Sequence, residues 1–166
     1  RHDDYLKFSE TFREGGVRMF ESGAICLYLA GRSETLLPVD EAERARALCW
    51  TFAALNSVEP AILHLQSVRV FNREKPGAAE FAPTVEENLR SRLRDLQTAL
   101  GDHDWLEGRF TVGDLLMVSV LRQLRRGDWL TDHPALGAYV SRGEARPAFT
   151  RAIEAHMADL QEATVA

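Results

Sequence analysis

The stretch Phe110-Thr111-Val112-Gly113-Asp114-Leu115 constrains the fold more than any other part of the chain. Thr111 and Asp114 have the spacing of a capping box, in which each side chain satisfies a backbone N–H left free at the start of a helix. Phe110 can contact Leu115 as a hydrophobic staple across the same turn. Gly113, a poor helix former, indicates close backbone packing there. The pattern predicts that Thr111 and Asp114 form the structural N-cap of a buried helix.

Further helices are predicted along most of the chain. Apolar residues at helical intervals follow four predicted starts, at Asp40, Thr84, Pro134 and Pro147. The first two carry capping-box spacing with Glu43 and Glu87, and the helix at Thr84 is predicted to follow a loop over 72–83. Proline inside the Asp40 helix predicts a kink between Asn56 and Pro60, because proline removes a backbone hydrogen bond.

The N-terminal part of the chain differs from the rest. Residues 1–14 are mostly polar, and the Gly15-Gly16 pair that follows predicts a turn into a short strand at Val17–Phe20. Ser22 is predicted as the N-cap of a helix that stops at Gly31. Because this helix is apolar nearly all round, we expect it to be buried between two layers. The chain is therefore predicted to be mainly α-helical with a small extended element.

Composition excludes several classes of function. The 166 residues suit a single globular domain, and 45% of them are hydrophobic. A net charge of −5 supplies no basic field for nucleic acid, and no apolar run approaches the ~20 residues of a membrane span. His, Asp and Glu show no metal-ligand spacing, so no metal is expected. Cys26 and Cys49 are expected to be buried, inert thiols, and the protein is expected to be cytoplasmic.

Glu21-Ser22 is the strongest candidate for chemistry. A strand followed directly by a serine at a helix N-terminus presents free amide groups, a hydroxyl and the positive end of the helix dipole. That combination suits a carboxylate or phosphate, and Glu21 adds an acceptor for an ammonium group. Together the two residues suit an α-amino acid moiety. The alternative is that Ser22 only caps the helix and Glu21 is a solvated turn residue.

An ordered series of motifs resembles the glutathione S-transferase family from about Val17 to Leu160. The stretches that carry it are Phe20–Leu29, Leu36-Leu37-Pro38, Trp105-Leu106-Glu107-Gly108, Phe110–Asp114, His133-Pro134-Ala135-Leu136 with Tyr139, and Arg146-Pro147-Ala148-Phe149. The resemblance implies a mainly α fold, in which a helical bundle like the family's C-terminal domain follows the remnant of a thioredoxin-like α/β domain. It implies a partial thioredoxin-like domain over 1–31, a linker over 32–39 and an all-α domain over 40–166.

The resemblance also implies a ligand and its binding residues. Glu21 and Ser22 would hold the γ-glutamyl end of glutathione, which is the co-substrate. Asn56 would reach the glutathione of a partner subunit. The alternative is that Asn56 lies on the helix surface or hydrogen-bonds a backbone group left free at the kink. A hydrophobic electrophile would lie in a cleft bordered by the predicted helix over 40–70.

Three residues of that helix, Phe52, Glu59 and His64, are candidates for lining the electrophile's pocket. Phe52 belongs to the apolar repeat of the helix, and the expected kink opens space for a hydrophobic ligand beside it. His64 is the only histidine in this long apolar helix; its alternative is a core or groove histidine satisfied by a neighbour.

The departure from the family pattern lies near the N-terminus. The family's thiol-activating Tyr, Ser or Cys and its cis-proline loop have no counterpart, since no proline precedes Pro38. Tyr5 and Ser9 lack the strand and turn expected of an activating group, so the catalytic residue is unknown. The first residue is not methionine, and we expect the chain to lack N-terminal residues and a short internal stretch.

The sequence therefore supports two functions. In the first, the intact protein is a glutathione transferase that conjugates glutathione to hydrophobic electrophiles through an activated thiolate, and it forms a homodimer. In the second, the chain is a non-catalytic binding or interaction module of the same architecture. An unrelated helical bundle is a weaker third possibility, which pairing of Val17–Phe20 with another strand in a mixed sheet would exclude.

Overall fold

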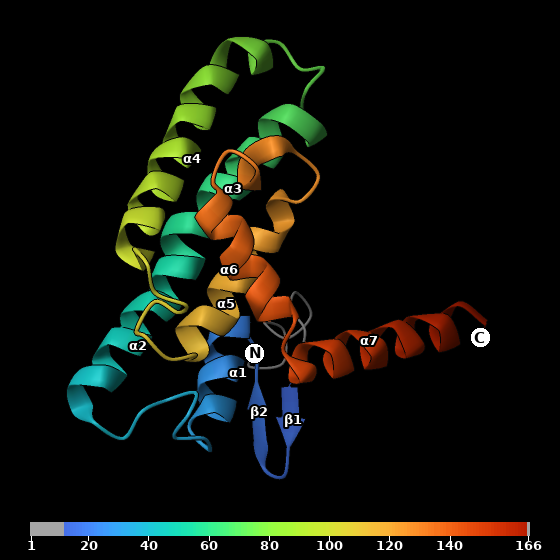
Figure 1. The fold of residues 1–166 in the computed structure, drawn as a ribbon. Helices are drawn as coiled ribbons and strands as arrows, with labels where there is room; N and C mark the ends of the chain where they lie inside the picture. Colours follow the sequence, from blue (N-terminus) through green and yellow to red (C-terminus); the bar gives the residue numbers. More distant parts are fainter. Residues whose placement is uncertain (1–11, 166) are drawn as a thin grey trace.

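The computed structural model describes residues 12–165, with side chains described up to residue 161 (Figure 1). Tyr5, Ser9 and the absent proline step near them lie outside the described residues. Helices dominate, as predicted. The α-helices are α1 (Ser22–Ala30), α2 (Glu41–Ala53), α3 (Glu59–Gln66), α4 (Ala78–Leu100), α5 (Val112–Leu121), α6 (Pro134–Glu144) and α7 (Pro147–Val165). Shorter helical turns are η2 (Ala54–Val58), η3 (Ser67–Phe71), η4 (Arg122–Leu124) and η5 (Asp128–Leu130).

The helical core forms around α5, which packs against α2, η2 and α6, while α3 packs against α4 (Figure 1). Eight of the ten residues of α5 are buried, because this helix lies in the middle of the bundle. Ile62, Met117 and Leu136 are fully buried and come from three different helices. Burial of such side chains supplies the main favourable free energy of folding. The capping box at Thr111 thus starts the central helix, as the sequence predicts.

A hairpin precedes α1. The strands β1 (Phe12–Glu14) and β2 (Val17–Met19) pair antiparallel, with Phe12 opposite Met19 and Glu14 opposite Val17. The strand at Val17 is the predicted one, but β1 was not predicted, because its three residues are too few and too polar to show an alternating pattern.

The prediction that the helix after Ser22 is buried between two layers is wrong for the described residues. Only Gly23 and Ala30 of α1 are buried, and Leu29 is 39% exposed. Composition alone could not reveal this, because burial depends on how many neighbours surround the helix. In the described part of the chain, α1 packs against α5 and Leu55 of η2, and Tyr28 of α1 contacts Phe12 of the hairpin.

Immediately before Pro60, where the sequence predicts a kink, the helix type changes. The η2 segment is a π-helical turn, in which Glu59 N–H bonds to the carbonyl of Ala54 rather than to the fourth residue back. Pro60 has no N–H to donate, so a wider turn immediately before it absorbs the lost bond. A second π-helical turn, η3, ends α3 and was not predicted.

The fourth long helix begins earlier than the sequence predicted. It starts at Ala78 after Gly77, whose φ of 81° is in the left-handed region, and not at Thr84. Pro83 therefore lies inside α4 rather than in the preceding loop. Extending the helix buries Ala82, which is 1% exposed and continues the apolar stripe of α4. Burial of Ala82 offsets the free-energy cost of the backbone hydrogen bond that Pro83 cannot make.

The last helix, α7, projects away from the bundle (Figure 1). From Arg151 to Gln161 its side chains are exposed except for the half-buried Ile153. Within the described residues, no helix is long and apolar enough to cross a membrane.

Candidate functional site

The first turn of α1 holds the two strongest candidate residues. Glu21, not Ser22, is the N-cap residue, so the predicted cap is wrong by one position, and Ser22 is the first helical residue. Glu21 has φ 71° and ψ 117°, and its side chain makes no capping hydrogen bond. A non-glycine residue in this region stores backbone strain that the surrounding structure must maintain. Strain of this kind concentrates at ligand-binding sites.

The start of α1 is exposed. Helix geometry gives the N–H groups of the first turn no intrahelical acceptor, and the first recorded bond runs from Ile25 N to Glu21 O at 3.0 Å. Glu21 and Ser22 are both exposed. The arrangement therefore offers amide donors, a hydroxyl and a carboxylate within two residues, which suits an anionic group beside an ammonium group.

A close contact positions α1 against the helical domain. A Cβ atom added to Gly23 would lie 2.6 Å from Cδ1 of Leu55, so glycine allows α1 to approach η2 at this point. The candidate site therefore rests on the π-helical turn next to Pro60.

Side chains that no sequence pattern singles out join α1 and the residue after it to the hairpin. Both guanidinium nitrogens of Arg32 donate to the carboxylate of Glu14, one of them at 2.8 Å between Nη1 and Oε1. The Arg32 guanidinium also lies 4.7 Å from the ring centre of Tyr28, whose ring contacts that of Phe12. Hydrogen bonding from Arg32 lowers the pKa of Glu14. Nothing in the sequence pattern indicated this pair, because the two residues are eighteen positions apart.

The remaining predicted site residues lie on the continuous run of α2, η2 and α3. Phe52 and Asn56 are exposed, His64 is exposed and Glu59 is half-buried. Glu59 Oε1 accepts a 3.1 Å hydrogen bond from Nε2 of Gln123. Among the described residues, no hydrogen bond or ion pair joins these four side chains to Glu21 or Ser22. His64 is not a core histidine, since its side chain is exposed; a position in a groove stays a prediction.

The two cysteines have different surroundings. Cys26 is half-buried in α1, and burial raises the pKa of its thiol. Cys49 is exposed on α2, so the prediction that both thiols are buried is wrong for Cys49. Helical periodicity placed Cys49 next to apolar residues, but periodicity does not say which of them a neighbouring helix covers. In the described part of the chain, no group of three His, Cys, Asp or Glu residues could hold a metal ion.

A buried polar network anchors the start of α5. The Asp114 carboxylate accepts hydrogen bonds from the backbone N–H of Thr111 at 2.9 Å and of Leu106 at 3.0 Å. It also accepts one from the hydroxyl of Tyr139 at 2.9 Å. Burial and the neighbouring negative charge of Asp114 raise the pKa of Tyr139. The network is structural: it joins the loop before α5, the helix start and α6.

The segment before α2 is fixed to the same region. Val112 N–H bonds to the carbonyl of Leu36 at 2.9 Å, and Arg109 donates to the carbonyl of Glu34 and lies 3.2 Å from the Glu43 carboxylate. These contacts hold the connection between α1 and α2 against the start of the central helix. The position of Glu21 and Ser22 relative to the helical domain is thus set from two directions, by this connection and by Gly23.

Comparisons with known proteins agree with this architecture. No protein-family model matches the chain. It is 32% identical over 113 residues to "Glutathione S-transferase GstA" of Escherichia coli O157:H7, covering 66% of this chain and 53% of that protein. The chain thus spans about half the length of this curated relative.

Solved structures share the fold. A glutathione transferase family member from Pseudomonas fluorescens Pf-5, crystallised with two glutathione molecules, superposes with a TM-score of 0.74 at 24% identity, over 81% of this chain and 63% of that one. The bacterial protein BphK in a ternary complex gives a TM-score of 0.75 at 22% identity, over 93% of this chain and 76% of that one. In sequence and fold, the chain is therefore similar to glutathione S-transferases.

Proposed function

We propose that Glu21 and Ser22 bind the γ-glutamyl end of glutathione, and that the intact protein conjugates glutathione to hydrophobic electrophiles. The observation that carries the proposal is the N-terminus of α1: Glu21 has φ 71° and no capping hydrogen bond, so the first-turn amides stay available to a ligand. The γ-glutamyl group carries a carboxylate for those amides and the Ser22 hydroxyl, and an ammonium group for the Glu21 carboxylate. Charge and hydrogen-bonding capacity therefore match on both sides.

Conjugation forms a bond between the glutathione sulfur and an electrophilic carbon, while the thiol proton goes to solvent or base and the leaving group departs. The attacking species is the thiolate, so the reaction needs a group that lowers the thiol pKa. No such group is assigned among the described residues. The part that this chain's own residues perform is to bind and orient the co-substrate, which raises the effective concentration of its sulfur at the electrophile.

The electrophile is proposed to lie along α2, η2 and α3, beside Phe52 and Glu59, with His64 at the far end. The exposed ring of Phe52 supports this, since its 53% exposed surface can be covered by an apolar ligand. Asn56, one turn beyond Phe52, is proposed to contact the glutathione of a partner subunit in a homodimer.

The boundaries of the two structural units are proposals of the same kind. We place the partial thioredoxin-like unit at 1–31, the linker at 32–39 and the helical domain at 40–166. The protein is proposed to act in the cytoplasm, where a tripeptide thiol remains reduced.

The test is retention of the chain on immobilised glutathione, followed by a conjugation assay with a generic aromatic electrophile. Glu21→Gln and Ser22→Ala are expected to reduce retention strongly. The first removes the carboxylate that faces the ammonium group of the γ-glutamyl end, and the second removes the hydroxyl that faces its carboxylate. Glu41→Gln is the matched control: it removes an exposed carboxylate from the first turn of a different helix, α2, and is expected to change nothing. Equal retention of all three variants would contradict the assignment of Glu21 and Ser22.

The alternative, a non-catalytic binding or interaction module, rests on the absence of a thiol-activating residue from the recognised motifs. Retention that depends on Glu21 and Ser22 without any conjugation would favour it. Conjugation that is lost in the Ser22→Ala variant would favour the enzyme.

A further inference from the structure

Two residues, Phe20 and Glu21, join the β-hairpin to α1. Strand β2 ends at Met19 and α1 begins at Ser22, so the backbone dihedral angles of Phe20 and Glu21 set the angle between the two elements. Peptide bonds are planar, which leaves no other soft rotation in this connection. Any rotation of the hairpin against α1 must therefore change the backbone at or beside Glu21, which has φ 71° and ψ 117°. The candidate glutathione site, Glu21 with Ser22, lies at this pivot.

The hairpin lies alongside α1 and is attached at the far end of that helix (Figure 1). Both terminal nitrogens of Arg32, the second residue after α1, donate to the two carboxylate oxygens of Glu14 in β1. A planar guanidinium and a planar carboxylate that meet through paired bonds have a fixed relative orientation. The nine residues of α1 span about 13 Å, so this contact restrains the hairpin well away from the pivot. A restraint far from a pivot limits rotation more than the same restraint close to it.

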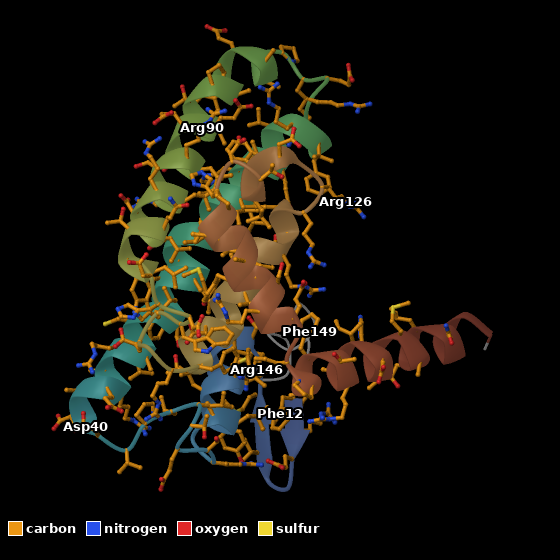
Figure 2. The ribbon with its side chains drawn as sticks, viewed as in Figure 1. Phe12, Asp40, Arg90, Arg126, Arg146 and Phe149 are labelled. Atoms are coloured by element: carbon orange, nitrogen blue, oxygen red, sulfur yellow. The ribbon has the colours of Figure 1, made fainter. Side chains whose placement is uncertain are left out.

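Aromatic contacts extend the same attachment. The Arg32 guanidinium lies 4.7 Å from the ring centre of Tyr28, which is in the last turn of α1. The ring of Tyr28 meets the ring of Phe12 edge to face, with 5.9 Å between their centres (Figure 2). Phe12 and Glu14 are two positions apart in β1, so their side chains leave the same face of the strand. One face of β1 is therefore joined at two points to the end of α1 and to Arg32.

The ion pair is suited to fix an orientation rather than to stabilise the fold. The side chains of Arg32 and Glu14 are 49% and 45% exposed, and ion pairs this close to water contribute little to the free energy of unfolding. Their paired hydrogen bonds nevertheless depend on direction, because a hydrogen bond weakens steeply when it is bent. Replacement of Arg32 is therefore expected to leave the protein folded while it loosens the hairpin about Phe20 and Glu21.

We propose that Arg32 is a positioning residue for the candidate glutathione site. By holding Glu14 and Tyr28, it keeps the hairpin at one angle to α1 and so fixes the direction in which the Glu21 carboxylate meets the ammonium group of the ligand. Preorganisation of this kind raises affinity, because less ordering remains to be done when the ligand binds. The inference rests on the proposed function, since it concerns the contact between Glu21 and the γ-glutamyl end of glutathione.

The test compares glutathione with N-glutaryl-cysteinylglycine, an analogue that lacks only the amino group of the γ-glutamyl end. Isothermal titration of the full chain measures the dissociation constant of each ligand. The parent chain is expected to bind glutathione about threefold to fivefold more tightly than the analogue, which is the size of one exposed charge pair. Arg32→Gln should lower this ratio to below about twofold, because a misdirected Glu21 carboxylate no longer distinguishes the two ligands.

Combined variants show whether Arg32 acts through Glu14 and Glu21. Glu14→Gln should lower the ratio as Arg32→Gln does, and the two changes together should lower it no further, because either one breaks the same pair. In a Glu21→Gln background, Arg32→Gln should leave the ratio unchanged. Arg92→Gln removes an exposed guanidinium from α4 and is the matched control, which should keep the ratio of the parent. The urea unfolding midpoints of Arg32→Gln and Arg92→Gln should both stay close to that of the parent.

The outcomes separate this inference from the proposed function. A ratio that Glu21→Gln abolishes but Arg32→Gln leaves intact would overturn the positioning role alone. Equal loss of affinity for both ligands in Arg32→Gln would also overturn that role, because it indicates a general structural effect. Absence of glutathione binding by the parent chain, or equal binding of the two ligands, would overturn the assignment of Glu21 and this inference with it.

Discussion

The hydroxyl of Tyr139 donates a 2.9 Å hydrogen bond to Oδ1 of Asp114, and both side chains are completely buried. The same carboxylate satisfies the backbone N–H groups of Leu106 and Thr111. The Thr111 hydroxyl also donates to Oδ2 of Asp114 at 3.2 Å, so this buried charge receives four hydrogen bonds. Removing the carboxylate leaves all of these donors unsatisfied. The relationship links α6 to the first turn of the central helix.

Asp114→Ala is therefore expected to lower the free energy of unfolding by more than about 3 kcal/mol. Tyr139→Phe, which leaves the backbone partners intact, should cost about 1.5–3 kcal/mol, because one hydrogen bond to a charged group is lost. Urea unfolding monitored by circular dichroism measures both values. Asp95→Ala, an exposed position on α4, is the control and should stay within about 0.5 kcal/mol of the parent.

Alkaline pH tests the raised pKa of Tyr139. Because the folded-state pKa lies above the unfolded value, the contribution of Tyr139 to stability is complete below about pH 10 and is lost as the pH rises further. The stability difference between the parent and Tyr139→Phe should therefore shrink above that pH, since phenylalanine does not titrate. A difference that stays constant from pH 8 to pH 11 would contradict the raised pKa.

Gly113 tests the packing of α2 against α5. A Cβ atom at this position would lie 2.6 Å from Cβ of Trp50 and 3.1 Å from the carbonyl oxygen of Ala47. Both neighbours are close to the backbone and cannot rotate away, so Gly113→Ala should destabilise the protein by about 1–3 kcal/mol. Gly16→Ala is the matched control, because nothing lies within 4 Å of its added Cβ. Equal unfolding midpoints for the two variants would argue against close packing at the α2–α5 crossing.

The cysteines should differ in their reaction with a thiol reagent at neutral pH. Cys49 is exposed and should react first, whereas Cys26 is half-buried and its raised pKa leaves less thiolate available. Mass spectrometry after timed labelling with an aromatic disulfide would resolve two phases. Cys49→Ser should remove the fast phase and Cys26→Ser the slow one; the reverse order would show that burial of α1 differs from that described here.

Local signals in the sequence predicted those features that depend on residues close together in the chain. Two such features are the capping box of Thr111 with Asp114 and the start of α2 after Asp40. A third is the π-helical turn before Pro60. Each involves bonds within about one helical turn. The same reasoning failed at Thr84. The spacing of Thr84 and Glu87 suits a cap, but α4 begins earlier, at Ala78, and includes Pro83. Burial of Ala82 favours this earlier start.

The candidate site was only partly predictable. The pair Glu21-Ser22 and its place after a strand were read from the sequence. The left-handed φ of 71° at Glu21 had no signal in the sequence, because a glutamate in that position predicts no such conformation.

The sequence by itself determined where most helices begin, which faces of them are apolar and which residues form the local caps. Those properties follow from backbone hydrogen bonding and from helical periodicity, both of which act over a few residues. The tertiary structure alone decided which apolar faces are covered, and it left Cys49 and much of α1 exposed while burying Asp114 with Tyr139. Burial is a property of the neighbours that surround a residue, and those neighbours come from elements far apart in the chain.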